Sequence, residues 1–279
     1  MTGLAAAPRC LAALLVRTLA ILLLGAARSV TAAELPSVML DDLTSPELAQ
    51  AIARGFTTVL VPIGGTEQNG PYMALGKHNV RARVLAERIA RTLGNAIVAP
   101  VIAYVPEGNV NPPTAHMRFP GTITVPDRAF EAILESAARS FRLHGFRDVV
   151  FLGDHGGYQT LEQAVATRLN REWASSPVRV HAMVEYYDLA AKRYSQMLRE
   201  QGYRDAEIGT HAGLADTSLA LAVDPTLVRA GGLRSESAPT AAQGVYGDPR
   251  RSSAELGATG VDVIVAETAK AIRKAASTR

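Results

Sequence analysis

The stretch that decides the fold is VPIGGTEQNGPYMALGKHNV, residues 61–80. It completes an apolar run at residues 57–63, and such a run is typical of a buried strand. Two glycines follow, and then Glu67 and His78 lie on one glycine-rich loop immediately before a helical pattern. Ligands of open α/β sheets bind beyond the carboxyl ends of the strands. The stretch therefore predicts a strand, a ligand-binding loop and a helix in that order.

The rest of the chain repeats this alternation. Further apolar runs lie at residues 96–105, 148–152 and 178–184, and their continuous apolarity indicates strands buried on both faces, as in parallel sheets. Helical patterns occupy residues 79–94, 130–145, 161–169, 188–201 and the region from 252 onward. Asn79 is the expected N-cap of the first helix, and Ser252 with Glu255 forms the expected capping box of the last. The pattern predicts an α/β fold with helices on both faces of the sheet.

Residues that can bind metal ions gather in the predicted loops. The loop after residue 152 carries Asp154 and His155 beside two glycines, a proline-rich loop carries His116, and a third loop carries His211 and Asp216. Zinc, manganese and iron accept carboxylate and imidazole ligands without any thiolate. These loops therefore predict a metal site at one edge of the sheet.

The spacing favours Glu67, His78 and His155 as the metal ligands. Two imidazoles and one carboxylate leave coordination positions open for water and substrate, as catalytic rather than structural sites do. Each residue also has a structural interpretation. Glu67 could bind backbone amides of its loop, His78 could lie exposed beside Asn79, and His155 could form a hydrogen bond within its glycine turn.

Two other kinds of site are disfavoured by the motifs. Neither GGTEQNG nor GDHGGYQ matches G-x-G-x-x-G or contains the lysine–serine pair of a phosphate-binding loop, and their acidic residues would repel phosphate. The chain also has no G-x-S-x-G elbow, which serine hydrolases of the α/β class use.

The first 32 residues are interpreted as a signal peptide. Arg9 and Arg17 precede an apolar run too short to span a bilayer, and small residues follow it up to Ala32. Cleavage there would leave a single domain over residues 33–279 in the periplasm or outside the cell, without a stable membrane anchor. An uncleaved anchor is the alternative. The leader contains the only cysteine, Cys10, so the mature chain has no thiolate chemistry.

The charge balance depends on this leader. The whole chain has 29 basic and 26 acidic residues, and three of the arginines lie in the leader. The mature chain would then have equal numbers of basic and acidic residues, so we expect no binding to nucleic acid.

The motifs resemble the creatininase (creatinine amidohydrolase) family of metal-dependent amidohydrolases. The resemblance runs from about residue 43 to residue 266 and is carried by five blocks in order: VPIGGTEQNGPYMALGKHN, HMRFPGTITV, DVVFLGDHGGYQ, HAGLADTS and GVYGDP. It implies a three-layer α/β/α sandwich with a mostly parallel sheet. It also implies hydrolysis of cyclic or linear amides by a metal-activated water, usually at a two-metal centre, and assembly as homo-oligomers, often hexamers.

Carried over by position, the family's ligand set is only partly present. Glu67 matches its first carboxylate ligand, and His155 matches the histidine of its Asn-Gly-His-Gly-Gly-Asn loop. Asn69 stands where the family usually has a histidine ligand, and His78 stands where it has a bridging aspartate. Tyr158 replaces an asparagine. Elsewhere, Asp154 stands where a glycine is usual, and Asp216 shortens the usual glutamate of the His-Ala-Gly block.

These departures favour one metal ion, because a neutral imidazole at His78 has one free lone pair and cannot bridge two ions. Zinc is expected, with manganese or iron as alternatives. Asn69 and Tyr158 are expected to contact substrate. A second ion bound through Asn69, with help from Asp154 or Asp216, is the alternative.

The resulting prediction is an exported metal-dependent hydrolase that cleaves a carbon–nitrogen bond of a small amide or cyclic amide. His211 or Asp216 would transfer protons to the leaving nitrogen, and His116 would hold the substrate from the proline-rich loop. The alternatives are a decayed periplasmic binding protein for a small ligand on the same scaffold, and a metal-dependent lactone or ester hydrolase.

Overall fold

The computed structural model describes residue 3 and residues 35–278. The chain divides into two compact units, Met1–Leu35 and Pro36–Arg279, and the second unit is described below. The predicted signal peptide, its cleavage point and Cys10 lie outside the described residues.

Four parallel strands form the centre of the second unit. They are β1 (Thr58–Ile63), β2 (Ala96–Val98), β3 (Asp148–Gly153) and β4 (Arg179–Ala182), in the spatial order β2-β1-β3-β4. All six residues of β1 and all six of β3 are buried, because helices cover both faces of the sheet. The predicted α/β fold with a parallel sheet is confirmed.

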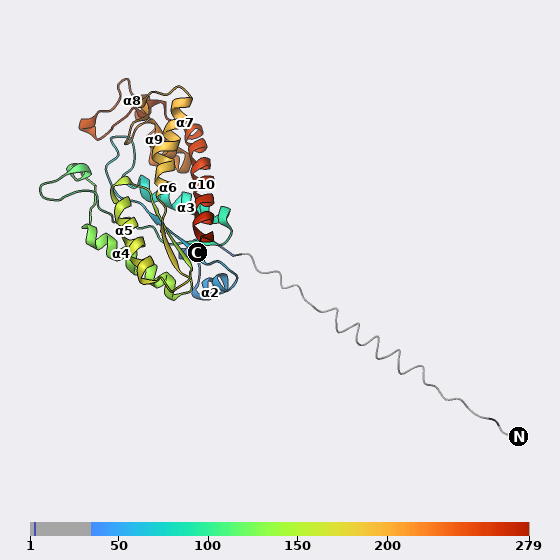
Figure 1. Cartoon of the computed structure of the whole chain (residues 1–279). Coiled ribbons are helices and arrows are strands. Elements are labelled where there is room, and N and C mark those ends of the chain that lie inside the picture. Colours follow the sequence, from blue (N-terminus) through green and yellow to red (C-terminus); the bar gives the residue numbers. More distant parts are fainter. Residues whose placement is uncertain (1–2, 4–34, 279) are drawn as a thin grey trace. The chain divides into compact units, whose positions relative to one another are not determined.

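Helices lie on each side of this sheet (Figure 1). On one side α4 (Asp127–Leu143) packs against α5 (Gln159–Glu172), and both contact β3. On the other side α3 (Lys77–Leu93) contacts β1 and β2, while α10 (Ala254–Ser277) packs on α3 and on α9 (Leu214–Val223). The result is the three-layer sandwich that the resemblance implies.

Shorter elements complete the unit. The remaining α-helices are α2 (Ser45–Ala53), α6 (Val184–Asp188), α7 (Tyr194–Glu200) and α8 (Asp205–Ile208). A π-helical turn, η4 (Leu189–Arg193), joins α6 to α7. The 3-10 turns are η1 (Leu40–Asp42), η2 (Ala115–Arg118), η3 (Gly156–Tyr158), η5 (Pro225–Leu227), η6 (Gly232–Arg234), η7 (Ala241–Gln243) and η8 (Pro249–Arg251). Within the described part of the chain, we find no helix long and apolar enough to cross a membrane.

Two predicted helix starts are corrected by the structure. Helix α3 begins at Lys77 rather than after Asn79, because the Asn79 side chain instead accepts a hydrogen bond from the amide of Gly65, at 2.9 Å. The N-cap of α10 is Ser253 rather than Ser252, and its hydroxyl accepts from the amide of Leu256.

Candidate metal centre

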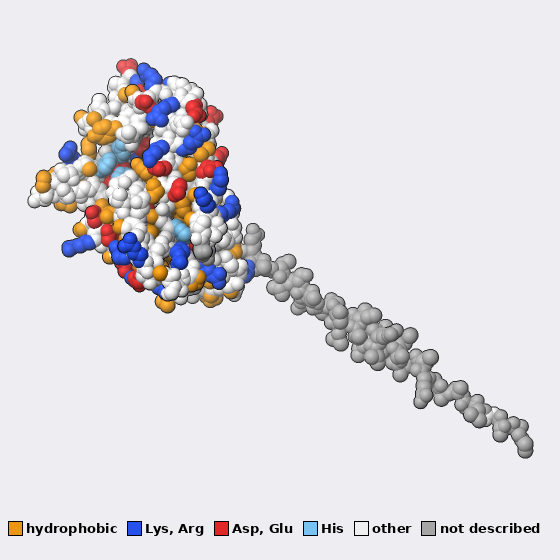
Figure 2. Space-filling model, in the orientation of Figure 1, with side chains coloured by type: hydrophobic (Ala, Val, Ile, Leu, Met, Phe, Trp, Pro, Cys, Tyr) orange, Lys and Arg blue, Asp and Glu red, His pale blue; other side chains and the backbone are white. Residues whose placement is uncertain are grey.

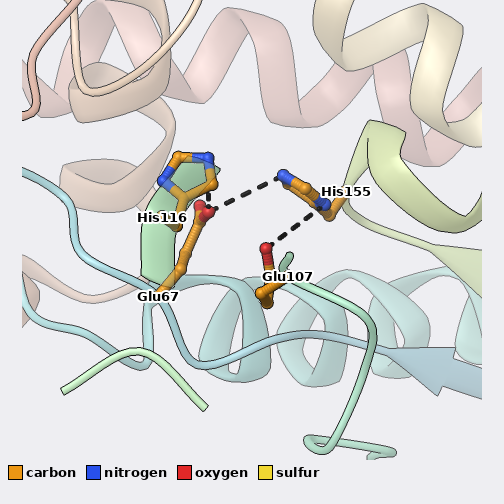
Figure 3. A group of neighbouring side chains, drawn as sticks. All are labelled: Glu67, Glu107, His116 and His155. Carbon is orange, nitrogen blue, oxygen red and sulfur yellow. Dashed lines mark ion pairs between the residues drawn. The ribbon is translucent and has the colours of Figure 1, made fainter. Parts of the chain in front are cut away.

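Four ligand-type side chains meet beyond the carboxyl ends of β1 and β3. They are Glu67, Glu107, His116 and His155, and each offers one ligand atom within 4.8 Å of the other three (Figure 3). Glu67 follows β1 and His155 follows β3, while Glu107 and His116 come from the loop between β2 and α4. The sheet therefore brings together residues that are 88 positions apart in the sequence, as expected for the edge where α/β proteins bind ligands.

Three of the four carboxyl oxygens in this cluster lack a hydrogen bond. The Oε2 atom of Glu67 and both carboxyl oxygens of Glu107 are buried without a hydrogen bond. His116 Nε2 lies 3.1 Å and His155 Nε2 lies 3.6 Å from Glu67 Oε2, and His155 Nδ1 lies 3.9 Å from a Glu107 oxygen. One ligand atom from each of the four side chains lies within 4.8 Å of the other three, and carboxylate oxygens and imidazole nitrogens are ligands that zinc accepts. The residues present therefore fit a divalent metal ion.

The histidines of the cluster are electrically suited to bind a cation. Burial lowers the pKa of His155 to about 3, although the Glu67 carboxylate acts in the opposite direction. Burial also lowers the pKa of His116. Both rings are therefore neutral near pH 7, and a neutral imidazole retains the lone pair that a metal requires. Burial, followed by the charge of Glu67, raises the pKa of Glu107 to about 8, so an ion that binds there would displace a proton.

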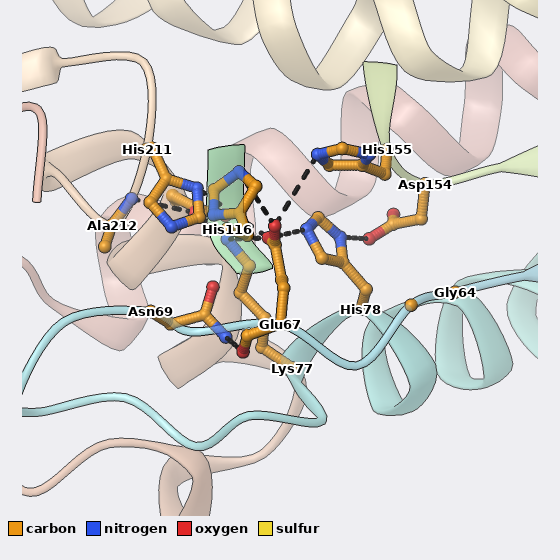
Figure 4. A network of polar contacts seen from close by, with 12 residues as sticks. Gly64, Glu67, Asn69, Lys77, His78, His116, Asp154, His155, His211 and Ala212 are labelled. Carbon is orange, nitrogen blue, oxygen red and sulfur yellow. Dashed lines mark hydrogen bonds and ion pairs between the residues drawn. The ribbon is translucent and has the colours of Figure 1, made fainter. Parts of the chain in front are cut away.

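The structure does not place His78 in this cluster, in contrast to the predicted ligand set. Its Nε2 lies 2.8 Å from Glu67 Oε1 and its Nδ1 lies 2.5 Å from an oxygen of Asp154 (Figure 4). Burial and the charge of Lys77 act to lower the pKa of His78, but its hydrogen bonds to Asp154 and Glu67 outweigh them and raise it. With a carboxylate at each nitrogen, the ring is held as an imidazolium and has no free lone pair for a metal.

A second group of charges lies beside His78. Arg81 forms hydrogen bonds to both oxygens of Asp154 and to Asp216 Oδ1, and Lys77 forms a hydrogen bond to Asp216 Oδ2. The charges of Lys77 and Arg81 overcome the effect of burial and hold the pKa of Asp216 well below its usual range. Asp216 therefore remains a carboxylate, which makes it a poor proton donor in this position.

A cavity of about 400 Å³ is lined by the two histidines of the cluster and by the charged group around His78. His211 also lines it, together with the less polar residues Tyr187, Ala190, Ala191, Leu219 and Tyr246. The volume suits a small molecule. Figure 2 shows histidine side chains reaching the surface beside hydrophobic ones, while basic and acidic side chains are interspersed over this face.

His211 lines this cavity and contacts both Gln68 and Glu67. Its Nε2 lies 2.9 Å from the backbone oxygen of Gln68 and 3.2 Å from the side-chain Nε2 of the same residue. Its Nδ1 lies 3.7 Å from Glu67 Oε1. Burial and the charge of Lys77 lower the pKa of His211 to about 4, so the ring is neutral near pH 7.

The two predicted substrate-binding residues lie away from the cavity. The Asn69 amide donates hydrogen bonds to the carbonyls of Glu67 and Ala74, so it braces its own loop. Tyr158 is fully buried, and its hydroxyl donates to the carbonyls of Ile63 and Gly64. Both side chains contact the backbone at the carboxyl end of β1, and the Oδ1 atom of Asn69 is buried without a hydrogen bond.

Glu107 and Lys77 were missed by the sequence reasoning. Glu107 lies two residues after the apolar run 96–105, so the rule that selected Glu67 and Asp154 would also have found it. The Glu107 carboxyl group can lie this close to the loop after β1 only because residue 65 is glycine, since a Cβ at Gly65 would lie 2.7 Å from Glu107 Oε1. Lys77 carried no such signal, because a lysine at the start of a helix is usually solvated.

The fold and the site together define an α/β protein with a candidate metal centre at the carboxyl edge of a parallel sheet. The sequence matches the family described as "Creatininase: Creatinine amidohydrolase" over residues 41–272. The chain belongs to this hydrolase family, and its cluster of metal-type ligands supports a divalent metal cofactor.

Among characterised relatives, the chain is similar to a mycofactocin precursor peptide peptidase of Mycolicibacterium smegmatis, with 36% identity over 39% of this chain. That match spans only 43% of the peptidase. It is also similar to the creatinine amidohydrolase of Pseudomonas putida, with 26% identity over 69% of this chain and 74% of the relative.

Solved creatininase structures share the fold. A structure described as "Creatininase Mn" superposes with a TM-score of 0.70 at 25% identity and covers 85% of this chain and 98% of its own. A creatininase variant described as "Zn-Zn type" gives a TM-score of 0.68 at 24% identity, with 85% and 98% coverage.

Proposed function

We propose that this protein is a metal-dependent hydrolase that cleaves a carbon–nitrogen bond of a small amide or cyclic amide. The observation that carries the proposal is the buried pair Glu67 and Glu107. Three of their four oxygens lack a hydrogen bond, and the neutral imidazoles of His116 and His155, which line a cavity, lie beside them. A cation would bind those oxygens, and the cavity leaves space for substrate beside it.

Glu67, Glu107, His116 and His155 would hold the ion. In this proposal Glu107 and His116 replace His78 among the predicted ligands, and His116 binds the ion rather than the substrate. A divalent ion bound there supplies Lewis acidity, which polarises a carbonyl and lowers the pKa of a water ligand from ~15.7 toward about 7. Zinc is the metal we propose, since nitrogen and carboxylate ligands suit it and its coordination can expand to five, which leaves a position for water beside these four side chains.

His211 is the residue proposed to move the proton. It lines the cavity, its Nδ1 lies 3.7 Å from Glu67 Oε1, and burial lowers its pKa to about 4, so the ring is neutral near pH 7. A neutral imidazole can accept a proton at one ring nitrogen and deliver it to a leaving nitrogen. Asp216 remains a carboxylate and holds Lys77, so we assign it a positioning role.

Metal-dependent turnover of a substrate panel tests the proposal. The panel contains linear amides, cyclic amides including creatinine, lactones and simple esters, and the protein is assayed after chelation and after reloading with zinc or manganese. We expect hydrolysis of at least one amide in the reloaded protein only, and its absence in His155→Ala.

Other outcomes identify the competing functions. Turnover confined to lactones or esters would favour the ester hydrolase. Tight binding of a small amide without turnover, in protein that retains metal, would favour a binding protein.

We further propose that the chain is exported and that residues 1–32 are removed. The support is the order of basic, apolar and small residues in the leader. Amino-terminal sequencing of protein from the cell envelope fraction should begin near Ala33. An intact Met1 on protein in the cytoplasmic fraction would contradict this.

We also propose a homo-oligomer, with a hexamer as the specific expectation. The support is the resemblance to the family. Light scattering coupled to size exclusion measures the mass, and a value near the 29.6 kDa of one full chain would contradict it.

A further inference from the structure

One part of the cavity surface is formed by apolar side chains of the protein core. Ala190, Ala215 and Leu219 line the cavity. Ala215 and Leu219 are buried members of the main hydrophobic cluster, and Ala190 packs against that cluster. The core therefore reaches the cavity at these three residues, which form its apolar wall.

The elements that form the apolar wall are separate from the loops of the metal cluster. Ala190 lies in the π-helical turn η4, while Ala215 and Leu219 lie four residues apart on one face of α9. In the π turn, the Tyr194 amide donates a hydrogen bond to the Leu189 carbonyl, five residues earlier. Such turns are rare and frequently lie at functional sites. Two helical segments thus supply an apolar contact surface that takes no part in holding the ion.

Small side chains keep this part of the cavity open. Alanine stands at positions 190 and 191, and both residues line the cavity. A longer side chain at either position would extend into the space of about 400 Å³ that the cavity offers. The space beside the wall is therefore available to a ligand rather than filled by the chain.

An aromatic ring also lines the cavity. Tyr246 is a large apolar residue that is 54% exposed. Its amide donates a 2.9 Å hydrogen bond to the carbonyl of His211, so backbone pairing holds it next to the residue proposed to move the proton. Aromatic side chains that line a ligand pocket bury a large apolar area when the ligand binds. Tyr246 therefore adds apolar surface beside His211.

The two kinds of lining residue recognise different parts of a ligand. His116, His155 and His211 offer polar nitrogen atoms, which suit the metal ion and the amide group. The apolar wall offers no hydrogen-bonding side chain, so a hydroxyl or charged group placed against it would lose water without gaining a partner. An alkyl or aryl group placed there is favoured instead, because apolar surface leaves water.

We infer that the substrate is an amide that carries an alkyl or aryl substituent, and that this substituent packs on Ala190, Ala215 and Leu219. The inference rests on the proposed function, because it names the class of amide that this site hydrolyses. Amides without such a substituent should be poorer substrates, because they leave the wall in contact with water.

Pairs of amides that differ only in an alkyl chain test this inference. Acetamide is compared with hexanamide, and 2-pyrrolidinone with N-pentyl-2-pyrrolidinone, on the zinc-loaded protein. Each methylene that moves from water onto the wall should raise kcat/KM about fourfold. Hexanamide has four more methylenes than acetamide, so its kcat/KM should be higher by roughly 50- to 250-fold.

Two variants connect this preference to the wall. Ala190→Gln and Ala191→Gln each place a polar side chain in or beside it, and should reduce the ratio of kcat/KM for hexanamide to that for acetamide by about tenfold or more. A ratio measured within one protein cancels any change in metal content. Ala164→Gln is the control and should keep the wild-type ratio, because Ala164 is exposed on α5 and does not line the cavity. An unchanged ratio in both folded wall variants would overturn the inference.

Calorimetric binding of acetamide and hexanamide separates this inference from the proposed function. Tighter binding of hexanamide without turnover of any amide would support the inference and overturn the proposed hydrolysis. Equal kcat/KM within both amide pairs would overturn the inference and leave the proposed function intact. Equal or absent binding together with no turnover would overturn both.

Discussion

The two halves of the site handle buried charge in different ways. In the half formed by Lys77, His78, Arg81, Asp154 and Asp216, each charged group contacts an opposite charge within the chain. In the half formed by Glu107, His116, His155 and the Oε2 side of Glu67, three carboxyl oxygens have no hydrogen bond. Both halves lie at the same edge of the sheet and share Glu67.

The difference indicates which half depends on an external ion. The first half supplies its own cations, so its stability should not require metal. The second contains Glu67 Oε2, the Glu107 carboxyl group and two neutral imidazoles, and burial raises the pKa of Glu107 to about 8, so a cation that binds there displaces its proton. Variants in the first half should therefore change folding stability, and variants in the second should change metal affinity.

The largest expected change is in folding stability, in the half of the site where Arg81 and Lys77 pair with Asp154 and Asp216. Arg81→Met should lower the free energy of unfolding by roughly 3–5 kcal/mol, because it leaves Asp154 and Asp216 buried without their shared partner. The value should fall near the lower end, since Lys77 still pairs with Asp216 and the Asp216 side chain is 16% exposed. Denaturant unfolding measures this.

Arg83→Met is the matched control for Arg81→Met. Arg83 is exposed on the same helix, so its loss should change stability by less than about 0.5 kcal/mol. Equal effects of the two substitutions would show that the buried pairs contribute nothing particular to stability.

The next effect lies in the metal-dependent half. Glu107→Gln should weaken zinc binding by more than about 100-fold, the upper end of what loss of an outer-shell partner costs. At the same time it should leave the metal-free protein as stable as wild type or more so, because the amide removes a buried acid that lacks partners. Competition with a chromophoric chelator measures the affinity.

Glu255→Gln is the control for charge, because Glu255 is exposed at the start of α10. Unchanged zinc affinity in Glu107→Gln would contradict the assignment of Glu107 to the cluster. That result would favour Glu67, His78 and His155, the ligand set predicted from the sequence.

Much of the fold could be predicted because it depends on local patterns. Strands β1 and β3 are short apolar runs, and their predicted bounds differ from the observed ones by one residue. The run 96–105 was predicted as one strand, yet β2 ends at Val98. Pro100 follows two residues later, and since proline has no N–H to donate, it cannot continue the ladder.

The site was less predictable because its roles depend on partners far along the chain. Glu67 and His155 lie in the cluster as expected. The role of His78 depends on Asp154, which is 76 positions away and holds its second nitrogen. Asn69 and Tyr158 donate hydrogen bonds to the backbone carbonyls of Glu67 and Gly64. These bonds depend on the path of the backbone around each side chain, which the sequence pattern does not specify.

The smallest expected change in stability concerns Glu162. After Glu67 and Glu107 it is the third acid with buried oxygens that lack a hydrogen bond, and no cation contacts it in the described structure. Its side chain is fully buried on α5 below Gly153, and neither carboxyl oxygen has a hydrogen bond. Burial alone raises its pKa well above the usual range. It therefore shows how a carboxyl group behaves when neither the chain nor an ion neutralises it, and it remains protonated in the folded state.

The sign of the pH effect follows from that raised pKa. An unfolded chain ionises Glu162 above roughly pH 4.3, whereas the folded chain keeps the proton, so the unfolded state binds fewer protons. The stabilisation is complete below that pH and is lost as the pH rises toward the folded pKa. Between pH 5 and pH 6, wild type should lose up to about 1.4 kcal/mol relative to Glu162→Gln, because other titrating groups cancel in the comparison. Glu172→Gln on the same helix should show no such slope, since the hydrogen bond to Arg139 lowers the pKa of Glu172 to about 2 and the group is ionised in both states over this range. Denaturant unfolding at the two pH values measures the difference, and parallel curves for wild type and Glu162→Gln would show that Glu162 is ionised in the folded protein.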